Sequence, residues 1–283
     1  MKIIYFIVPA TAAILLIIGL IEPHLLKIER ISWINNSDST SLDKTARLRL
    51  ILLSDLHAEF NYVRLSKLIA QIRQAKPDLI LFAGDWVGPK RKGTLNKAHK
   101  WQIELSKTAT SLGVDLLAIA GNHDDEIIRS RLDQPDSGVK LLVNESMLVT
   151  SADGSNWQII GIDDLKHGQP EIPKKLLDVP AARSIIAAHN PDMLLHLPDC
   201  PGDYFLSGHF HGGQIWAPGK LEFKLFRREK IAAMGFHRGE FKYGGKTCYI
   251  SRGLGCVVMP IRLFSLPEMT IIDIEAASSK YEK

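Results

Sequence analysis

Cysteine is scarce in this chain, and neither sign of charge dominates. The three cysteines are Cys200, Cys248 and Cys256, and no two of them form a Cys-x-x-Cys pair. A structural zinc site built from thiolates is therefore excluded, and no disulfide is required. The formal net charge is only +4. This balance is too small to indicate a nucleic-acid partner, and it suits a phosphate-bearing ligand or an anionic membrane surface equally well.

Internal repeats are also missing, no twin-arginine pair precedes the amino-terminal apolar run, and only this one apolar run is long. Ile3–Ile21 contains nineteen residues without a charge. As a helix it would span roughly 28 Å, close to the hydrocarbon thickness of a bilayer. No small-x-small cleavage site follows the run, so we expect an uncleaved single-pass anchor in a cell membrane, with a removed signal peptide as the alternative. Basic residues on the two flanks balance, so the orientation stays open.

The rest of the chain is long enough for one large α/β domain. We divide the sequence into a transmembrane anchor (1–22), a juxtamembrane segment and linker (23–46), one large domain (47–275) and a polar tail (276–283). Residues 34–44 are polar and typical of a loop. Residues 25–33 are either interfacial or the first strand of the domain.

Helix and strand patterns alternate along this large domain. Apolar residues at helical spacing predict helices over residues 63–75 and 95–112, and a cap at Asn190 predicts a short helix over 193–197. The later part of the domain is richer in glycine and in short strands, predicted at 221–226, 246–251 and 269–274. Alternating βα units followed by a β-rich half predict a layered α/β sandwich.

Five short apolar runs each lead into polar residues that can bind a metal. The runs are Leu48–Leu53, Leu79–Ala83, Leu116–Ala120, Ile185–Ala188 and Tyr204–Leu206. Runs of this length are typical of buried strands, and α/β proteins build their sites at the carboxyl ends of such strands. The polar residues that follow the runs are Asp55, His57, Asp85, Asn122, His123, Asp124, His189, His209 and His211.

The residue types and spacings of this set indicate a metal centre. Asp55 and His57 are two apart, as are His209 and His211, so in extended chain each pair can face one ion. Glycines precede Asp85 and Asn122 and let the backbone turn tightly or approach closely. Imidazole, carboxylate and amide donors without thiolate suit divalent Mn, Fe, Co, Ni or Zn.

Two such ions would equip the site for hydrolysis of phosphate esters. A pair of divalent ions can hold a hydroxide at neutral pH, clamp phosphoryl oxygens and stabilise an in-line displacement. The leaving oxygen then needs a proton, and His123 beside Asn122 is the natural general acid. Asp124 is expected either to orient the His123 imidazole or to start a helix.

The order of these motifs resembles the calcineurin-like metallophosphoesterases. That family carries D-x-H, G-D, G-N-H-[DE], a lone His and G-H-x-H. The chain has Asp55-Leu56-His57, Gly84-Asp85, Gly121-Asn122-His123-Asp124, His189 and Gly208-His209-Phe210-His211 in the same order. Gly212-Gly213-Gln214-Ile215, Ser251–Gly255 and Pro260-Ile261-Arg262 are similar to the membrane-anchored bacterial branch, which extends the resemblance to about residue 275.

The resemblance implies a fold, a ligand set and an activity. The fold would be a four-layer α-β-β-α sandwich of two mixed β-sheets. Asp55, His57, Asp85 and His211 would hold one ion, and Asp85 would bridge to a second ion held by Asn122, His189 and His209. The activity would be hydrolysis of phosphomonoesters, phosphodiesters or pyrophosphates by a metal-bridging hydroxide.

Several alternatives stay open at the level of sequence. An anchored enzyme gains most from substrates in the same membrane, which favours diesters or pyrophosphates, such as a UDP-2,3-diacylglucosamine-type lipid-linked pyrophosphatase in a bacterial inner membrane. The rival from another class is a non-catalytic partner-binding scaffold, which would be expected to have lost ligands. Residues 220–246 are basic with interleaved aromatics, and they form either a solvated loop or a ledge for an acidic lipid headgroup.

Overall fold

The computed structural model describes most of the chain. The described residues are 2–35, 46–88, 94–132, 134, 136–179, 183–216, 222–223 and 227–276. Residues 36–45, which include most of the loop predicted over 34–44, lie outside this set, and so does the predicted tail from residue 277 onward.

The first sheet has six strands in the order β1-β12-β2-β3-β4-β5. Their bounds are β1 Lys27–Asn35, β2 Leu48–Leu53, β3 Leu79–Ala83, β4 Asp115–Ile119, β5 Lys140–Leu141 and β12 Glu268–Ala276. β2, β3 and β4 are parallel neighbours, whereas β12 is antiparallel to β2 and parallel to β1. Of the two alternatives for residues 25–33, the strand is therefore correct, because β1 forms an edge of this sheet.

The second sheet also has six strands, in the order β10-β11-β9-β8-β7-β6. Their bounds are β6 Glu145–Thr150, β7 Asn156–Gly161, β8 Ser184–Ala187, β9 Tyr204–Ser207, β10 Gly239–Tyr243 and β11 Lys246–Ile250. Two antiparallel hairpins, β6–β7 and β10–β11, flank the parallel pairs that join β7 to β8, β8 to β9 and β9 to β11. Both sheets are therefore mixed, as predicted.

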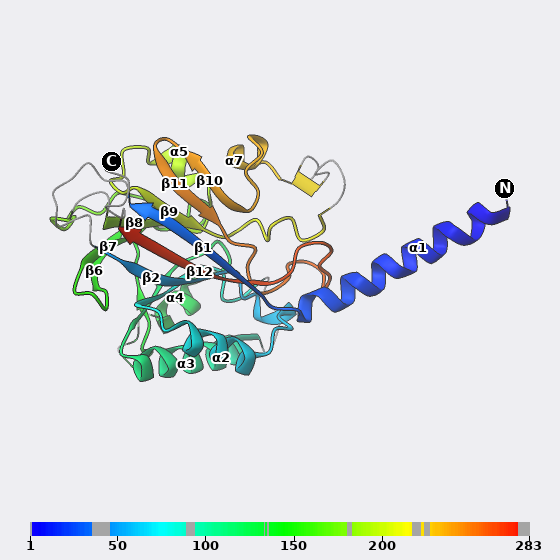
Figure 1. Cartoon of the computed structure of the whole chain (residues 1–283), viewed down its shortest axis with the longest axis horizontal. Coiled ribbons are helices and arrows are strands. Elements are labelled where there is room, and N and C mark those ends of the chain that lie inside the picture. Colours follow the sequence, from blue (N-terminus) through cyan, green and yellow to red (C-terminus); the bar gives the residue numbers. More distant parts are fainter. Residues whose placement is uncertain are drawn as a thin grey trace, which may run out of the picture.

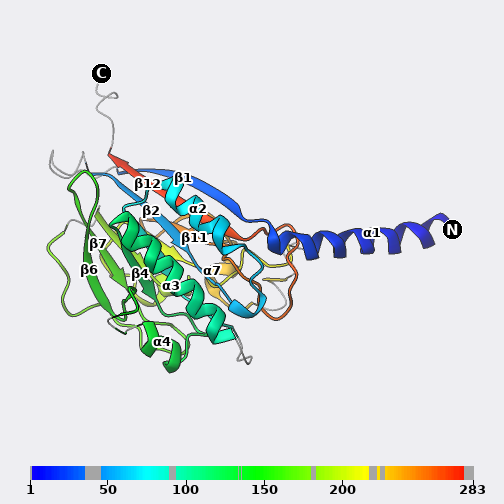
Figure 2. The same cartoon turned by 90° about the horizontal axis from the view of Figure 1, so that it is seen from below.

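Helices cover the outer faces of the sheets and form the amino-terminal extension (Figure 1). The helical elements are α1 Lys2–Ile21, η1 Glu22–His24, η3 Ala58–Phe60, α2 Leu65–Ala75, α3 Thr94–Leu112, α4 Glu126–Leu132, α5 Met193–His196 and α7 Lys230–Ala233. Figure 2 shows α2 and α3 lying over the first sheet. The three helices predicted in the large domain are confirmed, with ends that differ by at most two residues.

The strand predicted at residues 221–226 is wrong where it can be compared. Its two described residues, Glu222 and Phe223, are helical. Phe223 is buried, with its ring centroid 4.0 Å from that of His237 and 6.0 Å from that of Phe210. Its apolar character thus reflects packing against other rings, not pairing in a sheet.

Three separate hydrophobic clusters define the layers of the molecule. One lies between the two sheets, a second between the first sheet and α2 with α3, and a third on the outer face of the second sheet. Strand β2 shows the alternation expected of a buried strand, because Leu50 and Leu52 enter the cluster between the sheets, whereas Ile51 and Leu53 enter the cluster under the helices. This arrangement confirms the predicted four-layer sandwich.

The carboxyl end of β2 lies on the side of the molecule where α1 joins it (Figure 1), and β3 and β4 run parallel to β2. β1 starts a few residues after α1, and its first residue Lys27 is opposite Glu268, the first residue of β12. Because β12 runs antiparallel to β2, with Thr270 opposite Leu52, β2 ends beside the start of β12. The register therefore places this edge of the sheet close to the end of α1.

Candidate metal centre

The five predicted runs form five strands whose carboxyl ends meet. β2, β3 and β4 deliver their polar residues from the first sheet, and β8 and β9 deliver theirs from the second. Within each sheet these strands are parallel neighbours, so their carboxyl ends share one edge. The site therefore lies between the two sheets at that edge.

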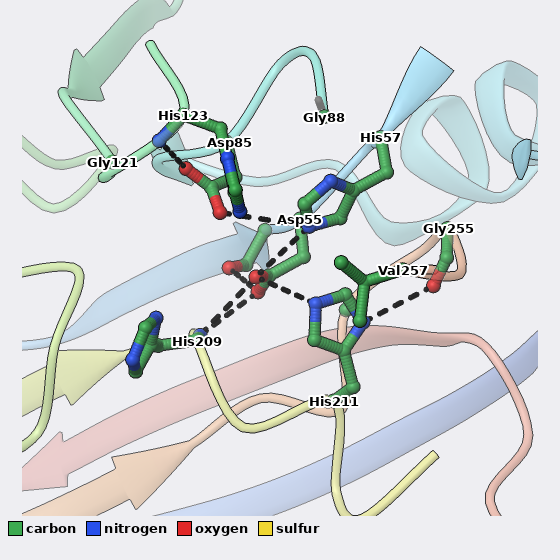
Figure 3. A network of polar contacts seen from close by, with 12 residues as sticks. Asp55, His57, Asp85, Gly88, Gly121, His123, His209, His211, Gly255 and Val257 are labelled. Atoms are coloured by element: carbon green, nitrogen blue, oxygen red, sulfur yellow. Dashed lines mark hydrogen bonds and ion pairs between the residues drawn. The ribbon is translucent and has the colours of Figure 1, made fainter. Parts of the chain in front are cut away.

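Asp55, His57 and His211 form one buried group of potential metal ligands (Figure 3). The Nε2 atom of His211 lies 3.3 Å from Oδ1 of Asp55, and Nε2 of His57 lies 3.8 Å from the same oxygen. The Ser54 hydroxyl and the backbone N–H of His209 donate hydrogen bonds to the Asp55 carboxylate. These bonds fix the carboxylate between the two imidazoles.

A second buried group contains Asp55, Asp85 and His189. Oδ2 of Asp85 lies 3.2 Å from Nε2 of His189 and 3.5 Å from Nε2 of His57. Asp55 thus belongs to both groups, and Oδ2 of Asp85 lies within 3.5 Å of an imidazole of each. Nδ1 of His209 lies 3.3 Å from Nε2 of His189, which brings a further imidazole to this side of the site.

Backbone strain is concentrated at these residues. Among the described residues other than glycine, nine have a positive φ, and five of the nine are residues of this site: Asp55, His57, Asp85, His209 and His211. Each such conformation costs on the order of 1–3 kcal/mol and persists only where the surroundings enforce it. Backbone strain at five residues whose side chains converge on one point indicates that the placement of these side chains serves a function.

Glycines permit the close approach of the loops that carry the site. Gly84 has a φ of +85°, a conformation that strongly favours glycine. Gly121 packs against Asp85 so closely that a Cβ atom there would lie 2.5 Å from the backbone nitrogen of Asp85. Both roles predicted for the glycines, a tight turn and a close approach, are thus present.

Hydrogen bonds on the far side of the imidazoles of His189, His209 and His211 set the orientation of these three rings. Nδ1 of His189 lies 2.8 Å from the carbonyl oxygen of Ala83, and Nδ1 of His211 lies 3.3 Å from that of Gly255. Nε2 of His209 lies 3.0 Å from Oε1 of Glu229. A histidine that binds a metal usually donates its other N–H in this way, which leaves the inward-facing nitrogen free for the ion.

The electrostatics of the site favour cations. Burial alone would raise the pKa of Asp55, but the imidazoles of His211, His57 and His189 outweigh burial and hold that pKa well below its usual value. The pKa of Asp85 is lowered for the same reason, mainly by His189. Burial likewise opposes the charged form of His189, yet Asp85 and Asp55 raise its pKa to about 10. Two carboxylates that remain ionised at such depth attract positive charge to their centre.

His123 and Asp124 hold different positions beside these groups. The backbone N–H of His123 donates a 2.8 Å hydrogen bond to Oδ1 of Asp85, and burial lowers the pKa of the His123 imidazole. The carboxylate of Asp124 accepts hydrogen bonds from the backbone N–H groups of Asp85, Trp86 and Gly121. Asp124 therefore ties together the loops after β3 and β4, while its predicted action on the His123 imidazole stays a prediction.

Unpaired buried atoms show that a metal fits the site. Within the described part of the chain, both ring nitrogens of His57 and Oδ1 of Asn122 are buried without a hydrogen-bond partner. Buried polar atoms are almost always paired, so such atoms require an explanation. A divalent ion would supply the missing partner, and the donor set of imidazole, carboxylate and amide is one that such ions accept.

A cavity of about 680 Å³ opens onto these residues. Its metal-site walls include His57, Asp85, Asn122, His209 and His211, together with His123. Arg227 and Lys166 add positive charge to the lining, Glu222 and Glu229 add negative charge, and Val257, Val258 and Met259 add an apolar wall. With divalent ions bound, the cavity would suit an anionic group that also carries an apolar portion.

Three residues of the site had not been singled out from the sequence as site residues. Glu229 contacts His209, and Arg227 donates to the His209 carbonyl oxygen at 3.1 Å. The buried Arg262 donates to the carbonyl oxygen of Ser265 at 2.9 Å and, more weakly, to that of His211 at 3.4 Å. Arg227 and Glu229 lie in the basic segment 220–246, where one glutamate gives no local signal, and Arg262 stands out only within the family-like Pro260-Ile261-Arg262 motif.

A four-layer α/β sandwich that gathers carboxylates and imidazoles at one sheet edge defines the metallophosphoesterase class of hydrolases. The chain belongs to the calcineurin-like phosphoesterase family, whose model matches residues 48–213. The candidate metal ligands of this metallophosphoesterase are Asp55, His57, Asp85, His189 and His211.

Alignments with related bacterial proteins cover most of the chain. The uncharacterized metallophosphoesterase YkoQ of Bacillus subtilis is 30% identical over 250 residues, which cover 87% of this chain and 90% of that protein. The UDP-2,3-diacylglucosamine pyrophosphatase LpxG of Chlamydia trachomatis is 27% identical, covering 89% and 90%. The phosphodiesterase YaeI of Escherichia coli is 28% identical, covering 82% and 84%.

Proposed function

We propose that the protein is a membrane-anchored phosphoesterase that uses two divalent metal ions to hydrolyse phosphodiester or pyrophosphate bonds. The observation that supports this most strongly is the position of the Asp85 carboxylate, with Oδ2 3.2 Å from an imidazole of one ligand group and 3.5 Å from an imidazole of the other. A carboxylate between two such groups is placed to bridge two ions.

The ligands divide between two ions in a way that the contacts support. Asp55, His57 and His211 would hold the first ion, with Asp85 shared. The second ion would be held by Asn122, His189 and His209, to which Asp85 would also contribute. Support comes from the unpaired Oδ1 of Asn122 and from the 3.3 Å separation of the facing nitrogens of His189 and His209.

The other residues position the substrate and move a proton. When bound, a pair of divalent ions supplies a nucleophile at neutral pH and stabilises charge on the phosphoryl oxygens. His123 faces the same cavity and donates a proton to the leaving oxygen. Arg227 and Lys166 hold the anionic substrate against the ligand groups. Asp124 holds the loops that carry Asp85 and His123 together, because its carboxylate accepts three backbone hydrogen bonds from them.

The named relatives favour diesters and pyrophosphates over monoesters. YaeI is named a phosphodiesterase, and LpxG is named for the pyrophosphate bond of a lipid-linked nucleotide. A UDP-2,3-diacylglucosamine-type substrate is therefore the specific form of the proposal. The scaffold alternative has no support, because the chain is a hydrolase of this family and every predicted ligand position carries a metal-binding side chain.

Anchoring to a bacterial inner membrane through α1 completes the proposal. α1 is long and apolar enough to cross a membrane, a property that signal sequences and some buried helices share. Most of its described side chains are exposed, which argues against a role in the core of this domain. We place the anchor at residues 1–22 and the catalytic domain at 47–275, with β1 added to its first sheet.

Turnover of matched chromogenic substrates tests the activity. We expect the full chain, in detergent with Mn²⁺, to release p-nitrophenol from bis(p-nitrophenyl) phosphate faster than from p-nitrophenyl phosphate. Faster release from the monoester would contradict the diester preference. No turnover of either ester with any divalent metal would argue against the activity itself.

The role of His123 has its own test. His123→Ala is expected to slow turnover by roughly 10²- to 10⁴-fold, the usual contribution of general acid catalysis, with the metal content unchanged. The exposed His196 of α5 provides the control, since its imidazole belongs to neither ligand group and does not line the cavity. If His123→Ala lost both ions, the assignment as general acid would be wrong.

A further inference from the structure

The loop between β11 and β12 exposes apolar side chains beside the metal centre. Val258 is 73% exposed, Phe264 is 54% exposed and Met259 is 41% exposed. Val258 and Phe264 also have positive φ values, of 65° and 57°. This conformation is a true outlier for a β-branched residue such as valine. The loop therefore holds apolar side chains in the open at a conformational cost, which indicates that another apolar phase covers them.

The same loop is bonded to the last turn of α1. The backbone N–H of Arg262 donates a 3.0 Å hydrogen bond to the carbonyl oxygen of Gly19, and Ser265 N–H donates to Oε2 of Glu22 at 3.2 Å. Ile261 packs on Gly19, where an added Cβ would lie 2.7 Å from its Cγ2 atom. Figures 1 and 2 both show the orange-red loop beside the end of α1.

This contact fixes the depth of the loop relative to the anchor. Gly19 precedes Glu22, the first charged residue after the apolar run, by three residues or roughly 4.5 Å of helix. If α1 spans the bilayer, that level is the membrane–water interface. Leu20 and Ile21 on α1 and Leu25, directly after η1, are exposed at this level as well. The loop and the end of α1 thus present apolar side chains to the same region.

The same loop also forms a wall of the metal cavity. Val257, Val258 and Met259 line the cavity, and Figure 3 shows Val257 beside His211. The side chain of Gln214 fixes this wall, because its Nε2 donates to the carbonyl oxygens of Val257 and Met259 at 3.1 and 3.0 Å. The loop that is bonded to α1 therefore also borders the metal ligands, and its exposed Val258 and Met259 lie at the cavity.

Basic residues flank the loop and the cavity. Arg238 donates a 3.0 Å hydrogen bond to the carbonyl oxygen of Phe264, and Arg227 and Lys166 line the cavity. Cations next to apolar side chains suit the headgroup region of an anionic membrane. We propose that residues 257–264 insert into the bilayer surface as a second membrane contact, so that the metal cavity receives a phosphate ester carried by a lipid. The substrate class rests on the proposed function, whereas the insertion itself does not.

Fluorescence quenching in proteoliposomes tests the insertion. Phe264→Trp in the full chain places a reporter in the loop by an exchange of aromatic rings, and Leu148→Trp places one at an exposed position on β6 in the second sheet. In vesicles of brominated phosphatidylcholine with phosphatidylglycerol, the added fluorescence of Phe264→Trp over wild type should be quenched, and that of Leu148→Trp should not. Equal quenching in the two variants would overturn the proposal. Cross-linking of the loops of two copies in the absence of quenching would also overturn it, because a second copy would then cover the loop.

Turnover separates the insertion from the hydrolytic function. Phe264→Asn suits the positive φ and removes the apolar ring, with Leu148→Asn as the control. We expect Phe264→Asn to lower turnover of phosphatidyl-p-nitrophenol in vesicles by about threefold or more, with turnover of soluble bis(p-nitrophenyl) phosphate unchanged. An equal loss on both substrates would overturn the delivery role of the loop. Quenching without any turnover by wild type would instead contradict the proposed function and leave the insertion standing.

Discussion

At the scale of single residues, the site is built from conformations that a free chain avoids. Asp55, His57, Asp85, His209 and His211 all adopt positive φ, and Gly84 and Gly121 allow the neighbouring loops to touch. The hydrogen bonds of Asp124 to three backbone N–H groups help to enforce that geometry. Strain held by packing and hydrogen bonds is a means of orienting ligands before a metal binds.

Gly121 offers a residue-scale prediction. Gly121→Ala would press a Cβ against Asp85, displacing the carboxylate that stands between the two ligand groups. We expect turnover to fall by about 100-fold, since displacements near 1 Å can have that effect, and bound metal to fall with it. Gly154→Ala is the control, because Gly154 has a φ of +85° but no atom within 4 Å of an added Cβ. A similar loss of turnover in both variants would show that general destabilisation, not the Asp85 contact, is responsible.

At the scale of elements, buried strands and their polar ends were predictable because each signal is local. An apolar run bounded by glycine and polar residues indicates a buried strand without reference to distant parts of the chain. The sequence therefore predicts β2, β3, β4, β8 and β9 together with the polar residues that follow them. The pairing of β1 with β12 was not predictable, because these strands lie at opposite ends of the chain and no local pattern names a partner. Glu229 was missed for the same reason, since only the fold brings it to His209.

The loop before β12 depends on one buried side chain. Arg262 is fully buried and donates to the carbonyl oxygens of Arg252, Gly253 and Gly255, as well as to those of Ser265 and His211. Through these bonds it joins the loop to the segment that follows β9 and carries a metal ligand. A guanidinium group is suited to this task, because it offers five N–H donors in a fixed plane.

Arg262→Lys is therefore expected to destabilise the protein. An ammonium group offers three donors and cannot serve all of these carbonyl groups, so the free energy of unfolding should fall by at least about 2 kcal/mol. Thermal unfolding in detergent would measure the change, with the exposed Arg131→Lys on α4 as the matched exchange expected to stay within about 0.5 kcal/mol. Equal stability of the two variants would show that the bonds of Arg262 contribute little.

At the scale of the whole molecule, the site joins the two sheets. Three of its strands belong to the first sheet and two to the second, so an ion bound by their ligands would contact both. The cluster between the sheets and hydrogen bonds such as that from His209 N–H to Asp55 already join the two layers, and a bound ion would add a further link. Metal binding should then stabilise the folded state as a unit.

Metal removal tests this coupling. Dialysis against EDTA is expected to lower the thermal unfolding temperature, and Mn²⁺ should restore it. A site saturated at 100 times its dissociation constant contributes about 2.7 kcal/mol. An unfolding temperature that changes with neither chelator nor metal would contradict the coupling. A decrease in unfolding temperature that Mg²⁺ alone reverses would indicate a harder, oxygen-rich site.

The number of divalent ions bound per chain tests most directly whether the two ligand groups form one centre with two ions. Elemental analysis of the wild-type protein should find two divalent ions, and Asp85→Asn should lose both ions together with all turnover. A single ion in the wild type, or two ions retained by Asp85→Asn, would contradict a carboxylate that bridges a pair of cations.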